Sequence, residues 1–225
     1  MLASSFAPVP APRSVDRPRR AAGLRGVPSL RAGAPSTTRA ALVVDFLTLA
    51  TLDPTVESLR VPPGPARFPM GDDTVEHAAD FELLRDGEPA LLVDVMEDEA
   101  LRDHPLAAAL AVGDEVVAED GRRLRVETAG TLRVEPRMRT ARLVMACRRT
   151  FVSAGDRVRI LHHLDECGTG RLVDCAGAAT SAMDGVAAVL ALAAEGLVAV
   201  DIRYPVVPEM PVRRRRLPPV DPFGF

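Results

Sequence analysis

Apolar residues recur along this chain with two different spacings, and these predict its helices and strands. An interval of three or four residues between apolar positions is typical of a helix, and alternation with polar residues is typical of a half-buried strand. The helical spacing occurs in residues 38–52, 101–119, 137–151, 156–164, 172–176 and 182–194. Short β-prone runs cover residues 56–61, 67–70, 80–84, 90–96, 122–127 and 197–202. Because a helix separates two of the strands, we expect an α/β protein built from layers of helices and strands.

The clearest local signal is a hairpin between residues 80 and 96. Two β-prone runs flank the dipeptide Asp86-Gly87, which favours a tight turn. If the turn centres on Gly87, residues whose numbers add up to about 174 face each other, so Asp80 lies opposite Asp94. Two facing carboxylates repel each other unless a cation or solvent lies between them. The pair therefore predicts either a metal site or a solvated acidic edge of the sheet.

Composition divides the chain into four parts. Residues 1–37 are rich in Pro, Ala, Arg and Gly and contain one acid, so we expect a disordered basic arm. Residues 38–135 contain most of the strands and form the first folded domain. Residues 136–204 are mostly helical, and three helices followed by a strand indicate a helical or winged-helix-like domain. Residues 205–225 are expected to form a basic, Pro-rich tail.

Charge is distributed unevenly, and this limits the possible partners and chemistry. The net charge is −3, but residues 72–127 carry five arginines against seventeen acids, whereas both flanking regions are positive. The ends of the chain could therefore attract a polyanion that the middle would repel. All 28 basic residues are arginine. Without lysine no Walker loop can be formed, and the Gly-x-Ser-x-Gly nucleophile motif is absent as well.

Three cysteines, an odd number, fit reduced thiols in a cytoplasm better than a disulfide framework. No secretory signal and no apolar run of about 18 residues is found, so we expect a cytoplasmic protein without a membrane partner. His163, Cys167 and Cys175 are of the residue types that bind zinc. Zinc sites more often contain close cysteine pairs, so buried cysteines beside a partly exposed histidine are the simpler interpretation.

Five short motifs follow one another between residues 39 and 203. They are Asp53-Pro54-Thr55-Val56, His77-Ala78-Ala79-Asp80-Phe81, Asp86-Gly87, Leu92-Val93-Asp94-Val95-Met96 and Gly121-Arg122-Arg123-Leu124-Arg125-Val126. In order and spacing they resemble the TnsA-like endonuclease subunits of heteromeric transposases, in the PD-(D/E)XK superfamily. The resemblance implies a restriction-endonuclease-like mixed sheet flanked by helices, with a winged-helix-like region after it. It also implies Mg²⁺-dependent cleavage of DNA, with Asp80 and Asp94 as catalytic metal ligands and DNA and a transposase subunit as partners.

The sequence departs from the family pattern at the positions that matter most for hydrolysis. Met96 stands where the family has a lysine, and the acid of the first helix falls near Arg39 or Val43, neither of which binds metal. Asp45 is close to that position without matching it, and Ala79 replaces the proline before Asp80. These departures indicate a loss of hydrolytic activity.

Three hypotheses remain open. The first is a TnsA-like protein that keeps the fold and two acids but has lost nuclease activity, and that works with DNA or a transposase. The second is an active metal-dependent endonuclease in which Asp45 supplies the missing acid and Arg123 or Arg125 replaces the lysine. The third is a winged-helix DNA-binding regulator acting through residues 150–216. The absence of basic residues from its third helix, residues 182–194, counts against the third hypothesis.

Overall fold

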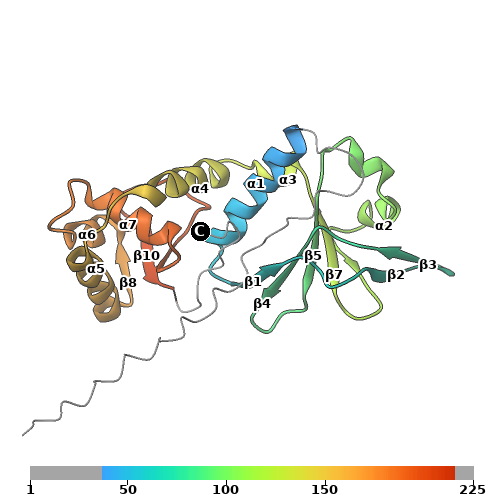
Figure 1. The fold of residues 1–225 in the computed structure, drawn as a ribbon, viewed down its shortest axis with the longest axis horizontal. Helices are drawn as coiled ribbons and strands as arrows, with labels where there is room; N and C mark the ends of the chain where they lie inside the picture. Colours follow the sequence, from blue (N-terminus) through green and yellow to red (C-terminus); the bar gives the residue numbers. More distant parts are fainter. Residues whose placement is uncertain (1–36, 216–225) are drawn as a thin grey trace, which may run out of the picture.

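The computed structural model describes residues 37–215 and contains a mixed five-stranded sheet in its N-terminal half (Figure 1). The elements of this half are α1 (Thr37–Leu52), β1 (Val56–Arg60), β2 (Ala66–Met70), β3 (Asp73–His77), β4 (Phe81–Arg85), β5 (Leu91–Val95), η1 (Ala100–Asp103), α2 (Ala107–Leu110), β6 (Val116–Val117), β7 (Arg123–Glu127) and α3 (Ala129–Leu132). The strand order is β1-β4-β5-β7-β6, and only β5 and β7 run parallel among these neighbours. The expectation of an α/β fold is confirmed.

The two faces of the sheet are covered by different parts of the chain. On one face α1 packs its apolar residues on the odd-numbered positions of β4 and β5, and the rings of Phe46 and Phe81 lie 5.1 Å apart. On the other face Phe68 and Leu106, from the β2–β3 hairpin and the η1–α2 segment, cover Leu92 and Leu124. Successive side chains of a strand point to opposite faces of the sheet. Val93 and Val95 of β5 face α1, so the side chain of Asp94 between them points to the opposite face, which Phe68 and Leu106 cover.

The predicted hairpin register is confirmed. Phe81 pairs with Val93, and Leu83 pairs with Leu91. Gly87 has a φ of 70°, a left-handed conformation that suits glycine at the turn. Asp80 lies one residue before β4, where the same register brings it beside Asp94.

Two expectations for local structure were wrong. Residues 101–119 do not form one long helix but two short helical turns, η1 and α2, followed by the short strand β6. Gly113 and Pro105 interrupt this stretch, and glycine and proline both disfavour a helix interior. The tail that was expected from residue 205 is also folded over its described part, because Pro211–Arg214 forms the strand β10. The expected basic arm lies outside the described residues except for Thr37, which begins α1.

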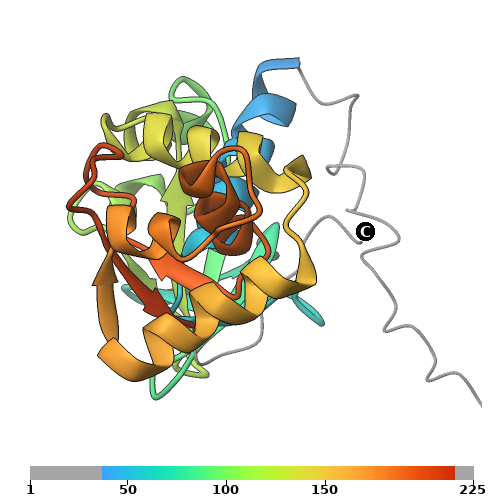
Figure 2. The ribbon, with the colours of Figure 1, turned by 90° about the vertical axis from the view of Figure 1, so that its left-hand side faces the viewer.

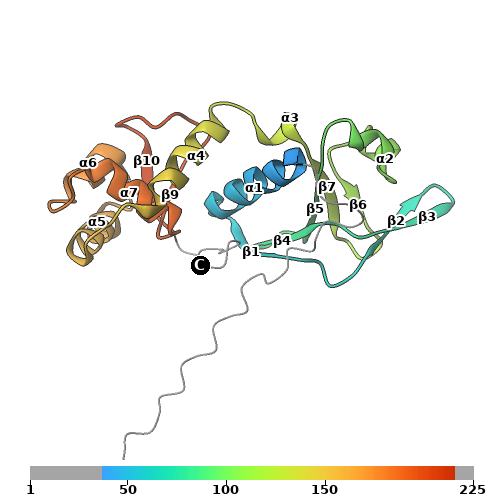
Figure 3. The same ribbon diagram turned by 45° about the horizontal axis from the view of Figure 1, so that its top comes forward.

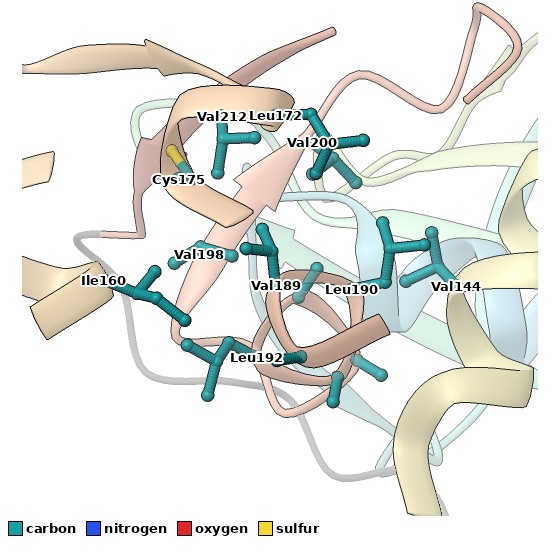
Figure 4. Close-up of a cluster of buried hydrophobic side chains, with 14 of the residues drawn as sticks. Val144, Ile160, Leu172, Cys175, Val189, Leu190, Leu192, Val198, Val200 and Val212 are labelled. Atoms are coloured by element: carbon teal, nitrogen blue, oxygen red, sulfur yellow. The ribbon is translucent and has the colours of Figure 1, made fainter. Parts of the chain in front are cut away.

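The second half of the chain forms a helical domain with a small antiparallel sheet (Figure 2). Its elements are α4 (Arg137–Ala146), η2 (Cys147–Arg149), α5 (Ala154–Cys167), β8 (Thr169–Arg171), α6 (Leu172–Gly177), α7 (Gly185–Ala194), β9 (Val198–Val200) and β10 (Pro211–Arg214). The strand order is β8-β10-β9. Figure 4 shows Val189, Leu190 and Leu192 of α7 surrounded by side chains from the other elements. Because α7 is apolar on all sides, it is the central core helix of this domain.

Helix α1 lies between the five-stranded sheet and the C-terminal domain (Figure 3). The buried carboxylate of Asp45 accepts hydrogen bonds from Arg133 and Arg142, and Arg142 belongs to α4. The guanidinium of Arg215 donates to the backbone oxygens of Thr51 and Asp53 at the end of α1. One helix therefore contributes to both cores. No helix among residues 37–215 combines the length and apolar character needed to cross a lipid bilayer.

Candidate functional site

The first carboxylate of the hairpin, Asp80, is paired with an arginine. The Nη2 atom of Arg39, in the first turns of α1, lies 2.9 and 2.8 Å from the two carboxylate oxygens of Asp80. Arg39 also donates through Nε to the backbone oxygen of Val95, 2.8 Å away, and the Val95 amide donates to Asp80 Oδ2. The guanidinium thus holds the start of α1 against the end of β5.

The second carboxylate, Asp94, lies between two histidines. Its Oδ2 atom is 2.6 Å from Nε2 of His77, at the end of β3, and 2.9 Å from Nε2 of His104, just after η1. Its Oδ1 atom accepts a hydrogen bond of 3.0 Å from the backbone amide of Asp80. Asp94 is 4% exposed and His104 is 7% exposed, whereas the side chain of His77 is 18% exposed, so the network is buried at His104 and reaches solvent only at His77.

A backbone hydrogen bond determines which ring nitrogen of His104 carries the proton. The Leu106 amide donates to Nδ1 of His104 over 3.1 Å, so this nitrogen acts as an acceptor and carries no proton. A neutral ring then carries its proton on Nε2, which donates to Asp94. His104 is therefore arranged in this structure as a hydrogen-bond donor to the carboxylate.

This environment favours the ionised form of Asp94. Burial by itself raises the pKa of the group, but the hydrogen bonds with His104 and His77, together with their electrostatic attraction, lower it more strongly. The resulting pKa is about 2, compared with an ordinary value of 3.8. The carboxylate is thus stabilised in its charged form by the groups that surround it.

The shift predicts a loss of stability in acid. A carboxyl group whose pKa is depressed by folding contributes stability above its unfolded value, and that contribution is lost as pH falls through the folded value. For Asp94 we expect a loss of about 2 kcal/mol between about pH 4 and pH 2. Urea unfolding of the wild type and of Asp94→Asn over this range tests the expectation. A variant curve as steep as that of the wild type would assign the loss to other carboxylates.

The residues around the two acids do not fit Mg²⁺. That ion binds oxygen ligands in a near-octahedral arrangement and usually keeps several waters. Here a guanidinium contacts both oxygens of Asp80, and two imidazole nitrogens flank Asp94. The magnesium site that the resemblance implies is therefore not formed by these side chains.

A nitrogen-binding metal is a different case. The donor atoms of His77, Asp94 and His104 lie within 4.8 Å of one another, and Zn²⁺ and other transition metals take such ligands. To bind through Nε2, His104 would have to carry its proton on Nδ1, opposite the Leu106 amide. Metal binding would thus require the local backbone hydrogen bond to break.

The residues that the second hypothesis adds to the site lie elsewhere. Asp45 is bound to Arg133 and Arg142 at the domain boundary. Arg123 and Arg125 pair with Glu115, and they face the side of the sheet opposite to Asp94. The structure thus corrects both substitutions in that hypothesis, because none of these side chains joins the two carboxylates. Met96 does lie at the site, since it lines a cavity of about 420 Å³ beside Arg39 and His104.

A larger cavity, of about 600 Å³, lies away from the carboxylates, between α1, β4 and β7 on one side and β9 and β10 on the other. It is lined by apolar side chains of α1 together with arginines and acids from both domains. Neither Asp80 nor Asp94 contributes to it. Cavity size alone therefore does not point to the hairpin site.

Sequence reasoning missed His104. His77 was noted because it precedes Asp80 in a recognisable motif, whereas His104 lies in a stretch that was expected to be helical. The available signal was the scarcity of histidine, of which the sequence has four. No protein-family model matches the chain, and no curated protein matches it in sequence. The assignment of a function therefore depends on the geometry of the site.

Proposed function

We propose that this chain is a TnsA-like protein with a nuclease fold that acts as a DNA-associated or transposase-associated partner and does not hydrolyse DNA. One observation carries the proposal: the guanidinium of Arg39 contacts both oxygens of Asp80. The guanidinium thus contacts the carboxylate that the resemblance assigns to the metal. The histidines around Asp94 also support the proposal, because they provide hydrogen-bond partners for its carboxylate without an ion.

The order of the elements supports the nuclease-fold part of the proposal. The motif-bearing segments form a helix, three antiparallel strands and a fourth strand parallel to the third, in the order α1, β1, β4, β5 and β7. In the second half, the order α5, β8, α6, α7, β9 and β10 supports the winged-helix-like part of the proposal. Its third helix, α7, is buried, so we assign this domain to partner binding and not to base reading.

A cleavage assay tests the loss of hydrolysis. Wild-type protein, incubated with supercoiled plasmid and with linear duplexes at rising Mg²⁺ or Mn²⁺ concentration, is expected to cut no more than Asp80→Ala or Asp94→Asn. Binding to the same duplexes, measured by mobility shift, should weaken steeply with salt because arginine contacts to phosphate release counterions. Cleavage that disappears in both variants would overturn the proposal.

A second candidate is a hydrolase that uses a transition metal, and the cluster of His77, Asp94 and His104 favours it. In this case Mn²⁺, which has little affinity for thiolates, raises the melting temperature of the wild type and leaves that of His104→Gln unchanged. The first proposal expects equal shifts in the two proteins. His162→Gln is the matched control, because His162 is an exposed residue that pairs with Glu166.

A further inference from the structure

A second group of metal-binding residue types lies in the C-terminal domain, about Gly170 in β8. His163 and Cys167 belong to the last turns of α5, and Cys175 belongs to α6. A Cβ atom built on Gly170 would lie 3.0 Å from Sγ of Cys175, 3.3 Å from Nε2 of His163 and 3.4 Å from Sγ of Cys167. Two thiols and an imidazole from two helices thus face the space in front of one glycine.

One ring nitrogen of the imidazole in this group lacks a hydrogen-bond partner within residues 37–215. Nε2 of His163 is buried and accepts or donates no hydrogen bond among the described residues. A buried polar nitrogen without a partner costs about 1–3 kcal/mol, so such atoms are rare in folded proteins. The atom points to the space that the two sulfurs share, where a ligand would satisfy it.

The thiols are also close enough to influence each other. Burial raises the pKa of the Cys175 thiol to about 11, and the charge of the neighbouring Cys167 adds to this effect. Cys175 is fully buried, as its place in Figure 4 beside the core illustrates, whereas Cys167 is exposed. The group therefore has a buried inner sulfur, from Cys175, and an outer sulfur on an exposed residue, Cys167.

We infer that His163, Cys167 and Cys175 form a binding site for a thiophilic divalent cation, of which Zn²⁺ is the best example. Zn²⁺ binds two thiolates and an imidazole with a fourth position left to water, at about 2.3 Å to sulfur and about 2.0–2.1 Å to nitrogen. The three donor atoms do not all lie within 4.8 Å of one another in this structure, so metal binding requires them to move closer together. Cys167 is the exposed member of the group, so its side chain has the most room to move.

The position of the site indicates its effect. It lies where α5 ends, β8 passes and α6 begins, so a bound ion would link the two helices across the strand. Gly170 is part of the site because it has no side chain to fill the space between the donors. The inference is independent of the carboxylate network, which contains no sulfur.

Cobalt provides the direct test. The full chain, purified under reducing conditions and stripped of metal, is titrated with Co²⁺, whose absorption reports bonds to thiolate. We expect about one Co²⁺ per chain with thiolate-to-cobalt bands, displaced by Zn²⁺. Cys167→Ser, His163→Gln and Gly170→Ala are expected to weaken binding by at least about 10-fold, the lower limit for a disturbed metal site. Cys147→Ser and His162→Gln are matched controls that should bind as the wild type does.

Zinc should also stabilise the wild type. At about 100 times the dissociation constant we expect a rise in melting temperature of about 5 °C or more, which Cys167→Ser abolishes and Cys147→Ser retains. Cys167 is exposed, so its replacement leaves the fold intact and keeps the test valid where Cys175→Ser does not fold. Absence of thiolate bands at saturating Co²⁺, or equal affinity in Cys167→Ser and the wild type, would overturn the inference.

Discussion

Replacement of Asp94 by alanine is expected to lower the free energy of unfolding by about 3 kcal/mol or more. The carboxylate is 4% exposed and has three partners: the imidazoles of His77 and His104 and the backbone amide of Asp80. Alanine leaves these groups without a partner, and each buried group that loses its partner costs about 1–3 kcal/mol. Urea unfolding at pH 7 measures the loss.

Two controls define the origin of that loss. Asp94→Asn keeps the shape and one acceptor oxygen, so it should cost less than alanine. Asp114→Ala removes an exposed acid and should stay within about 0.5 kcal/mol of the wild type. A loss of less than about 1 kcal/mol for Asp94→Ala would mean that water replaces the carboxylate and that the network is not closed.

The hairpin of β4 and β5 could be predicted from the local sequence pattern, whereas the segment that follows it could not. Two β-prone runs around Asp86-Gly87 were sufficient to predict the register of β4 and β5, because the turn and the alternation of side chains fix it. The segment after Met96 was misread because its apolar residues Leu106 and Leu110 recur at a helical interval. They are instead held by tertiary packing on the second face of the sheet, which a local pattern does not record.

The partners of the two acids could not be predicted for the same reason. Arg39 is 41 residues from Asp80 along the chain, and its role depends on how α1 crosses the end of β5. His104 reaches Asp94 only because η1 folds back over the sheet. The sequence motifs identified the two carboxylates, but only the fold shows which basic side chains contact them. The three residues around Gly170 were noted as zinc-ligand types, but their convergence depends on the turn between α5 and α6.

The interface between the two domains includes Arg215, a residue of the segment that the sequence predicts to be a basic, Pro-rich tail. Arg215 is 8% exposed, and its guanidinium donates to the backbone oxygens of Thr51, Asp53 and Val56 over 2.8–3.4 Å. The last carbonyls of a helix have no partner within the helix, and a cation there also interacts favourably with its dipole. Burial lowers the pKa of Arg215, while the nearby Asp53 opposes that effect. The arginine therefore satisfies the end of α1 from the other domain.

Arg215→Ala is accordingly expected to destabilise the protein by about 2–4 kcal/mol and to separate the unfolding of the two domains. The substitution leaves buried carbonyls without donors and opens a cavity at the end of α1. Arg215→Lys should recover part of the loss, because an ammonium group cannot reach all three oxygens in the geometry of the guanidinium fork.

Arg214→Ala is the matched control: that side chain is 43% exposed and lies 3.8 Å from Asp165, so its removal should cost less than about 1 kcal/mol. Calorimetry should show one transition for the wild type and for Arg214→Ala and two for Arg215→Ala. A single transition at an unchanged temperature in Arg215→Ala would mean that α1 holds the domains together without this arginine.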